Sequence, residues 1–211
     1  MICVSLDPAA PDLAVLTRAV DVMARGGVVA YPTDTLYGLA VDPRCAGAVD
    51  ALYRIKGREA GHPVSLVATS EAQVEACVGR LTDLGRRLAG RFWPGPLTLI
   101  IDAAPALAAA LHSASGRVGV RVPAHPVAAA LSALAGFALT STSANRSGDA
   151  PPATAGEVVA ALGDAVDLVL DAGPAPGGLP STLVDVTGSA PILVRAGAIP
   201  WDRVLESLTV S

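Results

Sequence analysis

The sequence predicts an α/β protein in which helices cover the faces of a mixed β-sheet. Segments with helical spacing of apolar residues alternate with short apolar runs along much of the chain, and strand-like runs accumulate toward its end. The 211 residues are 52% hydrophobic and 16% charged, which is typical of a folded globular chain. No internal repeat or linker is visible, so we expect residues 1–211 to form a single domain.

The expected helices are marked by helical spacing or by capping residues. Residues 12–25 place apolar side chains on one face and end at two glycines, and residues 46–55 have similar spacing. Two pairs of residues have the spacing of a capping box, namely Ser70 with Gln73 and Thr154 with Glu157. Further helices are expected from about Thr82, over residues 126–136 and over residues 201–208.

The expected strands are short runs rich in apolar and β-branched residues. They cover residues 28–31, 63–69, 97–102, 117–122, 137–144, 167–173, 181–187 and 191–197. The segment 173–181 is rich in proline and glycine, so we expect a loop there, either a mobile lid or an ordinary surface loop.

Composition argues against several classes of protein. Three scattered cysteines, Cys3, Cys45 and Cys77, lack paired spacing and indicate thiols in a reducing cytoplasm. The chain start has no signal-peptide pattern, so we expect a cytoplasmic protein. Residues 122–145 carry no acidic residue, Lys or Arg, but proline, histidine and glycine interrupt them, so we expect no membrane span. The net charge of −4 and the 3% aromatic content disfavour a nucleic-acid platform.

Polar residues follow apolar runs at several places, which is where ligands bind in open α/β sheets. Thr33, Asp34 and Thr35 follow the strand expected at 28–31, and Arg121 lies near the end of another. Further polar residues lie at the ends of expected helices or strands, namely Lys56, Arg58, Ser143, Asn145, Ser181 and Arg195. Cations and hydroxyls that converge in one cleft would suit a ligand with several negative charges, such as a polyphosphate with a carboxylate.

Each of these residues also has a purely structural interpretation. Lys56 and Arg58 at a helix C-terminus can oppose the helix dipole, and Ser143 and Asn145 can be turn residues. Arg121 can pair with an ordinary aspartate. The chain holds fourteen arginines and one lysine, however, so Lys56 can mark a place where a compact ammonium is needed. The three histidines, His62, His112 and His125, have no metal-ligand spacing, so we expect no protein metal site.

Seven segments of the chain resemble the threonylcarbamoyl-AMP synthase family, the YrdC-like proteins, over roughly residues 10–200. The matching segments, in the order of the family, are YPTDTLYGLAVDP, YRIKGR, RFWPGPLTLI, VGVRVPAHP, TSTSAN, LPSTLVDV and ILVRAG. The K-x-R pair of the second segment and the S-x-N pair of the fifth are the most specific part of the match. The resemblance implies a twisted, mostly open mixed sheet flanked by helices, with a large concave cleft.

The resemblance also implies a nucleotidyltransferase reaction. L-threonine, bicarbonate or CO₂, and ATP would give L-threonylcarbamoyladenylate and pyrophosphate, with Mg²⁺ bound through the ATP phosphates. The product would serve the N6-threonylcarbamoyladenosine modification at position 37 of tRNA. The implied partners are therefore small-molecule substrates, the threonylcarbamoyl-transferase complex that uses the product, and tRNA.

The family pattern assigns roles to individual residues. Thr35, Arg121 and Ser181 match the positions that hold L-threonine. The residues that match the positions at the nucleotide and the reacting carbamate are Lys56, Arg58, Ser143 and Asn145, with His62 and Arg195 at the nucleotide. Some relatives carry asparagine at the position of His62 and histidine at the position of Val67. A valyl side chain cannot hydrogen-bond to threonine, so Val67 is left out of the site.

Two alternatives remain open at the level of sequence. A carbamoyltransferase-like module has the same implied fold, but such proteins are large and carry cysteine-rich zinc fingers, which three scattered cysteines do not provide. A double-stranded RNA- or tRNA-binding or ribosome-assembly protein would use a basic concave face, and Arg80, Arg86, Arg87 and Arg91 form a basic group. The net charge of −4 disfavours this second alternative.

Overall fold

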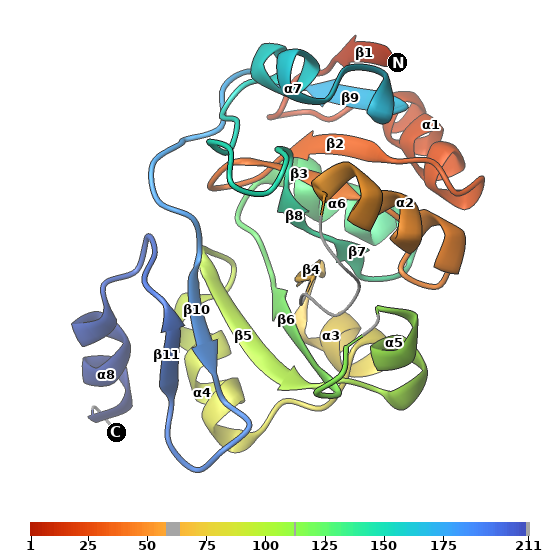
Figure 1. Cartoon of the computed structure of the whole chain (residues 1–211). Coiled ribbons are helices and arrows are strands. Elements are labelled where there is room, and N and C mark those ends of the chain that lie inside the picture. The colour runs from red at the N-terminus through yellow and green to blue at the C-terminus, as the bar shows by residue number, and fades with distance from the viewer. Residues whose placement is uncertain (58–63, 112, 210–211) are drawn as a thin grey trace.

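The computed structural model describes residues 1–57, 64–111 and 113–209. The expected mixed α/β fold is confirmed, and the strands are divided between a five-stranded and a six-stranded sheet (Figure 1). Each sheet contains both parallel and antiparallel pairs.

The five-stranded sheet has the order β1-β9-β2-β3-β8. Its strands are β1 (Ile2–Ser5), β9 (Leu168–Asp171), β2 (Val29–Pro32), β3 (Tyr37–Ala40) and β8 (Thr142–Ser143). Strands β2 and β3 form an antiparallel hairpin in which Pro32 lies opposite Tyr37. The hairpin turn therefore holds the polar residues that follow the first predicted strand.

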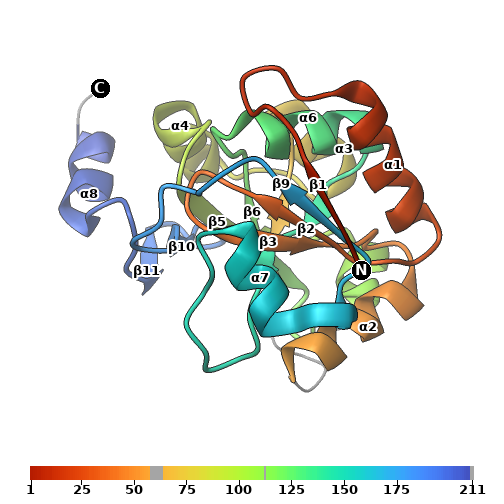
Figure 2. The same ribbon diagram turned by 90° about the horizontal axis from the view of Figure 1, so that it is seen from above.

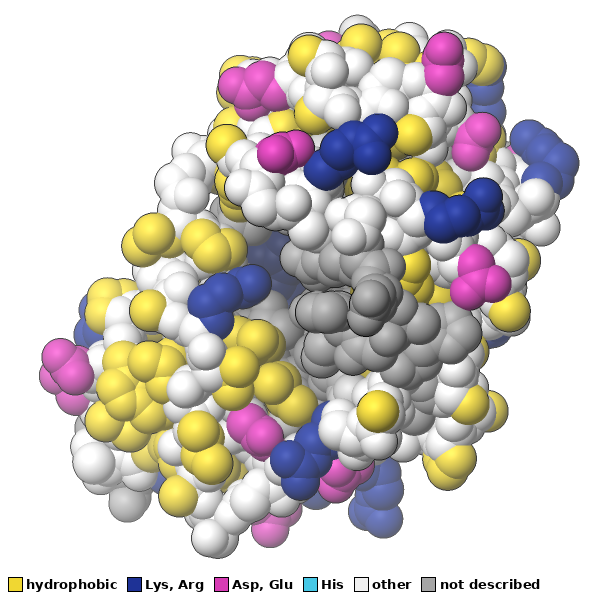
Figure 3. Space-filling view, in the orientation of Figure 1, with side chains coloured by type: hydrophobic (Ala, Val, Ile, Leu, Met, Phe, Trp, Pro, Cys, Tyr) yellow, Lys and Arg dark blue, Asp and Glu magenta, His cyan; other side chains and the backbone are white. Residues whose placement is uncertain are grey.

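The six-stranded sheet has the order β11-β10-β5-β6-β4-β7. Its strands are β11 (Ile192–Arg195), β10 (Thr182–Asp185), β5 (Leu97–Asp102), β6 (Arg117–Arg121), β4 (Leu66–Val67) and β7 (Leu139–Thr140). Edge strand β11 exposes Ile192 and Val194, and hydrophobic side chains gather over β10 and β11 on the face seen in Figure 3.

The strand expected at residues 137–144 is two short strands in different sheets. Strand β7 pairs with β4 in the six-stranded sheet, whereas β8 pairs with β3 in the five-stranded sheet. Between them, the backbone N–H of Ser141 donates to the Ser65 carbonyl at 2.7 Å. The Thr140 hydroxyl donates to Leu39 O at 3.2 Å and accepts from Val41 N at 2.8 Å. The two Thr140 bonds hold the hairpin strand β3 against β7 where the chain passes from one sheet to the other, whereas the Ser141 bond continues the β4–β7 pairing.

The helices lie where the sequence predicts them, with additions. They are α1 (Leu13–Ala24), α2 (Ala46–Lys56), α3 (Glu71–Cys77), α4 (Asp83–Phe92), α5 (Pro105–Ala110), α6 (Pro126–Ala135), α7 (Ala155–Leu162) and α8 (Trp201–Thr209), with a 3₁₀ turn at Gly163–Ala165. Strands β1 and β3 and helix α5 were not predicted from the sequence.

One of the two predicted capping boxes forms. Thr154 and Glu157 satisfy each other's backbone N–H groups at the start of α7. Ser70 caps α3, but the Gln73 side chain accepts from Thr69 N at 2.7 Å instead of from Ser70. The prediction that Gln73 would accept from the backbone N–H of Ser70 was therefore wrong, and the bond is to the preceding residue. The Gln73 side chain also bonds to Ser132 of α6, which fixes its orientation.

Helices cover both faces of the five-stranded sheet (Figure 2). Helices α1 and α6 pack together on one face, and α7 packs against β9 and β2 on the other. In the other half of the molecule, α4 packs between β5 and α8. No helix in the described ranges is long and apolar enough to cross a membrane.

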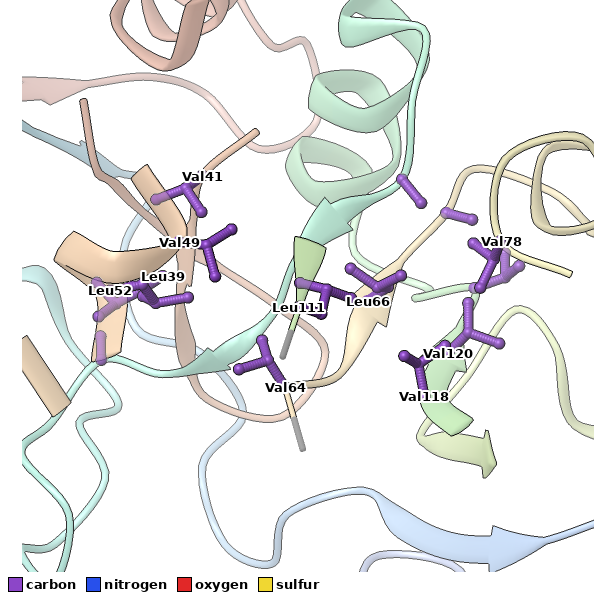
Figure 4. Packing of buried hydrophobic residues seen from close by; sticks show 14 of the residues in the cluster. Leu39, Val41, Val49, Leu52, Val64, Leu66, Val78, Leu111, Val118 and Val120 are labelled. Carbon is purple, nitrogen blue, oxygen red and sulfur yellow. The ribbon is translucent and has the colours of Figure 1, made fainter. Parts of the chain in front are cut away.

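One hydrophobic cluster joins the two sheets. Leu39 of β3 and Leu52 of α2 belong to the same cluster as Leu66 of β4 and Val120 of β6, and all four side chains are fully buried (Figure 4). Each buried side chain of this size contributes about 1.5–3 kcal/mol relative to an exposed one. The burial of this cluster therefore helps to hold the two sheets together.

Candidate functional site

A pocket of about 340 Å³ lies between the two sheets. The five-stranded sheet contributes the β2–β3 turn, Tyr37 and β8, and the six-stranded sheet contributes residues of β4, β5 and β6. Figure 3 shows the surface hollowed where the upper and lower halves meet, with basic side chains beside the hollow. Six residues predicted from the sequence line this one pocket, namely Thr35, Arg121, Ser143, Asn145, Ser181 and Arg195.

The β2–β3 turn is held by the Thr33 hydroxyl. This hydroxyl donates to Leu36 O at 2.7 Å and accepts from the backbone N–H groups of Thr35 and Leu36 at 3.2 and 3.3 Å. Thr33 is 1% exposed and Thr35 is 6% exposed, so the turn is part of the interior. The cluster of hydroxyls after the first predicted strand thus both closes a turn and lines the pocket.

Arg121 extends from the end of β6 to this turn. Its Nη2 donates to the Thr33 hydroxyl at 3.1 Å, and its Nη1 donates to the Thr35 hydroxyl at 3.3 Å. The same Nη1 forms an ion pair with Asp34 at 3.2 Å. The pairing with an aspartate that the sequence left open therefore exists, and the guanidinium still lines the pocket. Val67 lies opposite Arg121 in the β4–β6 pair and is fully buried.

Ser181 lies just before β10, beside two further pocket residues. The hydroxyls of Ser181 and Thr98 are 2.7 Å apart, and Arg195 Nη2 donates to Ser181 O at 2.9 Å. The backbone must pass closely here, because a Cβ on Gly197 would lie 2.3 Å from Pro180 O. Ser181 is therefore fixed from both sides by residues of β5 and of the segment after β11.

Lys56 lies at the end of α2 with its side chain in the interior. The residue is 2% exposed, and Nζ donates to Ser143 O at 2.5 Å and to Asn145 Oδ1 at 3.1 Å. The Asn145 amide in turn donates to Arg146 O and Asp149 O, both at 2.8 Å. The single lysine of the chain thus holds the segment after β8 in shape, next to the pocket that Ser143 and Asn145 line.

Two predicted site residues, Arg58 and His62, lie outside the described residues, so their contacts stay predictions. The segment 173–181, predicted as a loop, is attached to the site at two points. The Tyr37 hydroxyl donates to Gly173 O at 2.7 Å, and Gly177 N donates to Thr35 O at 2.9 Å. Its proposed role as a lid stays a prediction.

Two pKa shifts describe the surroundings of the site. Burial, with a contribution from the charge of Asp171, raises the pKa of Tyr37 to about 12, so this phenol remains a hydrogen-bond donor at neutral pH. Burial lowers the pKa of His125, and the negative charge of Asp34 opposes that shift. The negative charge of Asp34 therefore affects the pKa of His125, the residue before α6, as well as pairing with Arg121.

The described part of the chain holds no group of three or more His, Cys, Asp or Glu side chains that could bind a metal ion. Apart from Asp149, the polar lining of the pocket consists of hydroxyls, an amide and two arginines, which suit the oxygen atoms of anionic ligands.

Three residues at the site were not predicted from the sequence: Thr98 and Ser141 line the pocket, and Asp34 pairs with Arg121. Asp34 was visible as a polar residue after a predicted strand, whereas Ser141 lies inside the strand predicted at 137–144 and Thr98 lies within the apolar run LTLII. For Thr98, the signal in the sequence was a hydroxyl inside an otherwise apolar strand, because a buried polar group needs a hydrogen-bond partner.

Comparisons with known proteins identify the family of the chain. The Sua5/YciO/YrdC family model, described as "Telomere recombination", matches residues 21–197. A putative threonylcarbamoyl-AMP synthase of Mycobacterium tuberculosis is 40% identical over 195 residues, covering 92% of this chain and 89% of that protein. A threonylcarbamoyl-AMP synthase of Thiobacillus denitrificans is 43% identical over 164 residues, covering 78% and 87%.

Among solved structures, Pyrococcus abyssi Sua5 complexed with L-threonine superimposes with a TM-score of 0.93 at 29% identity. The match covers 99% of this chain and 61% of that one, so the chain spans about three-fifths of the length of that Sua5. With a family model that covers most of its residues, this chain belongs to the Sua5/YciO/YrdC family.

Proposed function

We propose that this chain is an L-threonylcarbamoyladenylate synthase, which makes threonylcarbamoyl-AMP and pyrophosphate from L-threonine, bicarbonate or CO₂, and ATP. The observation that carries the proposal is one pocket that Arg121 and neighbouring hydroxyls line together with Asn145, which accepts a hydrogen bond from Lys56. Relatives that are 40% and 43% identical over most of their length carry the name of this enzyme. The L-threonine complex of a structurally similar Sua5 supports the amino-acid substrate.

The amino acid would bind at Thr35, Arg121 and Ser181. A guanidinium fork matches the two oxygens of a carboxylate, and the neighbouring hydroxyls can bond to the polar groups of threonine. Ser181 lies on the opposite sheet from Thr35, so a ligand held by both would bridge the pocket.

The nucleotide and the reacting group would lie at Lys56, Ser143, Asn145 and Arg195, with Arg58 and His62 as further candidates. The threonine amine adds to CO₂ and releases a proton to solvent, which gives an anionic carbamate, and a carbamate oxygen then attacks the α-phosphorus of ATP. The bond from this phosphorus to the bridging oxygen breaks, and pyrophosphate leaves with the electron pair. Both reactants are anions, so fixed cations lower their repulsion and align the attack.

Mg²⁺ would enter as the ATP complex. The absence of a carboxylate-rich cluster from the described residues does not fit a resident magnesium site. The residues of the chain would therefore bind the phosphates and leave coordination of the ion to the nucleotide.

The product would be consumed by a threonylcarbamoyl-transferase complex that modifies adenosine 37 of tRNA, and contact with tRNA itself is a further expectation. Such a role belongs in the cytoplasm. The alternative of an RNA-binding protein is disfavoured because the net charge is −4 and the relatives named above are synthases.

The test is the release of pyrophosphate by purified protein with ATP and Mg²⁺. Release should require both L-threonine and bicarbonate, and it should fall strongly when L-serine or D-threonine replaces L-threonine. A folded protein that releases no pyrophosphate under these conditions, yet binds tRNA with a steep salt dependence, would contradict the proposal and favour the RNA-binding alternative.

A further inference from the structure

Asp34 is a buried carboxylate with an unusual set of contacts. Its side chain is 11% exposed, and neither carboxylate oxygen has a hydrogen bond to any residue that the structure describes. Its close charged contact is Arg121, whose Nη1 lies 3.2 Å from Oδ1 and whose side chain is 7% exposed. A buried charge without hydrogen bonds is costly, so its retention at this place calls for a reason beyond packing.

The contacts of Arg121 show what the carboxylate does there. The hydroxyls of Thr33 and Thr35 accept from Nη2 and Nη1, and Asp34 lies beside the same Nη1. All three residues belong to the β2–β3 turn, whereas Arg121 comes from β6 in the other sheet. The turn therefore holds the guanidinium in one orientation at the wall of the pocket.

The charge of Arg121 is balanced at its place in the pocket. Arg121 and Asp34 together carry no net charge. Lys56, which the resemblance assigns to the nucleotide, donates to Asn145 in another part of the lining, and Arg195 donates to Ser181 O. An arginine fork binds phosphate as readily as carboxylate, so geometry alone would not separate the two substrates. A neighbouring carboxylate in a water-poor site repels a multiply charged phosphate more strongly than a singly charged carboxylate.

We propose that Asp34 is the positioning and specificity residue of the Arg121 subsite, where it orients the guanidinium and keeps polyphosphate out of the amino-acid end. The inference rests on the proposed function, because it assumes that L-threonine and ATP share this pocket. A merely structural ion pair between the sheets would stabilise the fold and leave the choice of anion unaffected.

The test compares wild-type protein with Asp34→Asn, which removes the charge at nearly constant size. Threonylcarbamoyl-AMP is quantified by chromatography while inorganic tripolyphosphate inhibits at varied concentrations of L-threonine and ATP. In wild-type protein, tripolyphosphate should compete with ATP alone. In Asp34→Asn, the KM for L-threonine should rise about tenfold, the effect of one misplaced charged hydrogen bond, and tripolyphosphate should also compete with L-threonine.

Matched variants separate this effect from general damage. Asp42→Asn removes an aspartate whose pair with Arg44, at 2.8 Å, lies outside the pocket lining. It should keep the wild-type KM and inhibition pattern. Asp34→Glu should retain competition with ATP alone, since the charge is restored.

Three outcomes decide the matter. Competition between tripolyphosphate and L-threonine in wild-type protein overturns the inference without any variant, which covers the case that Asp34→Asn does not fold. A folded Asp34→Asn with wild-type KM and inhibition pattern overturns it as well. Wild-type protein that neither turns over nor binds L-threonine removes the proposed function itself, which is a different result from an active enzyme that ignores the change at Asp34.

Discussion

Replacing Lys56 with methionine would test whether its ammonium group both stabilises the fold around the site and contributes to turnover. Methionine keeps most of the length and apolar surface of lysine but cannot donate. The change would leave Ser143 O and Asn145 Oδ1 without the donor that now lies at 2.5 and 3.1 Å. Because Lys56 is 2% exposed, water cannot readily replace that donor.

The size of the effect follows from these contacts. Hydrogen bonds to charged groups contribute about 1.5–3 kcal/mol each, and the cost of burying the ammonium offsets part of that gain. A net loss of about 2–4 kcal/mol is expected, which lowers the Tm of a chain of this length by roughly 5–15 °C. Turnover should fall by far more than the folded fraction, since under the proposed function the variant also loses a cation beside the reacting phosphates.

The assay combines thermal unfolding with pyrophosphate release at a temperature where the variant is folded. Arg54→Met is the matched control, because it removes a positive charge from an exposed position on the same helix. It should change the free energy of unfolding by less than about 0.5 kcal/mol and leave turnover intact. A Lys56→Met protein with wild-type Tm and wild-type turnover would refute the reasoning.

Three further predictions concern single contacts. Arg121→Lys keeps the charge beside Asp34 but loses the fork, so the KM for L-threonine should rise about tenfold with a smaller change in kcat; steady-state kinetics with an unaltered KM would place the amino acid elsewhere. Thr98→Val removes the hydroxyl that lies 2.7 Å from Ser181 Oγ, so the KM for L-threonine should rise several-fold while unfolding changes by at most about 1.5 kcal/mol; equal KM values would argue against Ser181 as a ligand. Burial alone would raise the pKa of Asp42, but the hydrogen bonds and charge of Arg44 outweigh burial and lower it. The stabilisation from ionised Asp42 is therefore present above the unfolded pKa of about 4 and is lost as the pH falls through the lower pKa of the folded state. Urea unfolding should show that the free energy of unfolding of wild type exceeds that of Asp42→Asn by more at pH 6 than at pH 3. An equal difference at the two pH values would contradict this.

The sequence predicted the local parts of the fold well because their signals are local. Helical spacing and capping residues placed α1, α4 and α7, and apolar runs placed β5 and β6. Strands β1 and β3 were missed, because a four-residue segment such as YGLA becomes a strand through its partner and not through its own pattern.

The division into two sheets is equally non-local. Residues 137–144 have the composition of one continuous strand, and their split depends on pairing with β4 on one side and β3 on the other. Hydrogen-bond partners that are distant in the chain cannot be read from the segment itself.

The candidate site shows the same contrast. Thr35, Arg121 and Ser181 could be selected from their places near strand ends and from the family resemblance, and the structure brings them to one pocket. The pair of Asp34 with Arg121 joins a turn of one sheet to a strand of the other, so no spacing in the sequence reveals it. Thr98 was missed because the run LTLII does not show which face of β5 lines the pocket; in the structure Thr98 lies opposite Leu183 of β10 and lines the pocket.

The crossing of the chain between the sheets at Ser141 has a consequence for motion. The residues that would bind the ligand lie along the seam where the two sheets meet, and the Thr140 N–H···O Val41 bond joins β7 to the end of β3 across that seam. A ligand that contacts residues of both sheets would add further bonds between them. Amide hydrogens at the seam should then exchange with solvent more slowly once substrates are bound, whereas those deep within either half should be little affected. Local opening of the backbone would thus be most frequent between the two sheets, where the ligand binds, and ligand binding would reduce it.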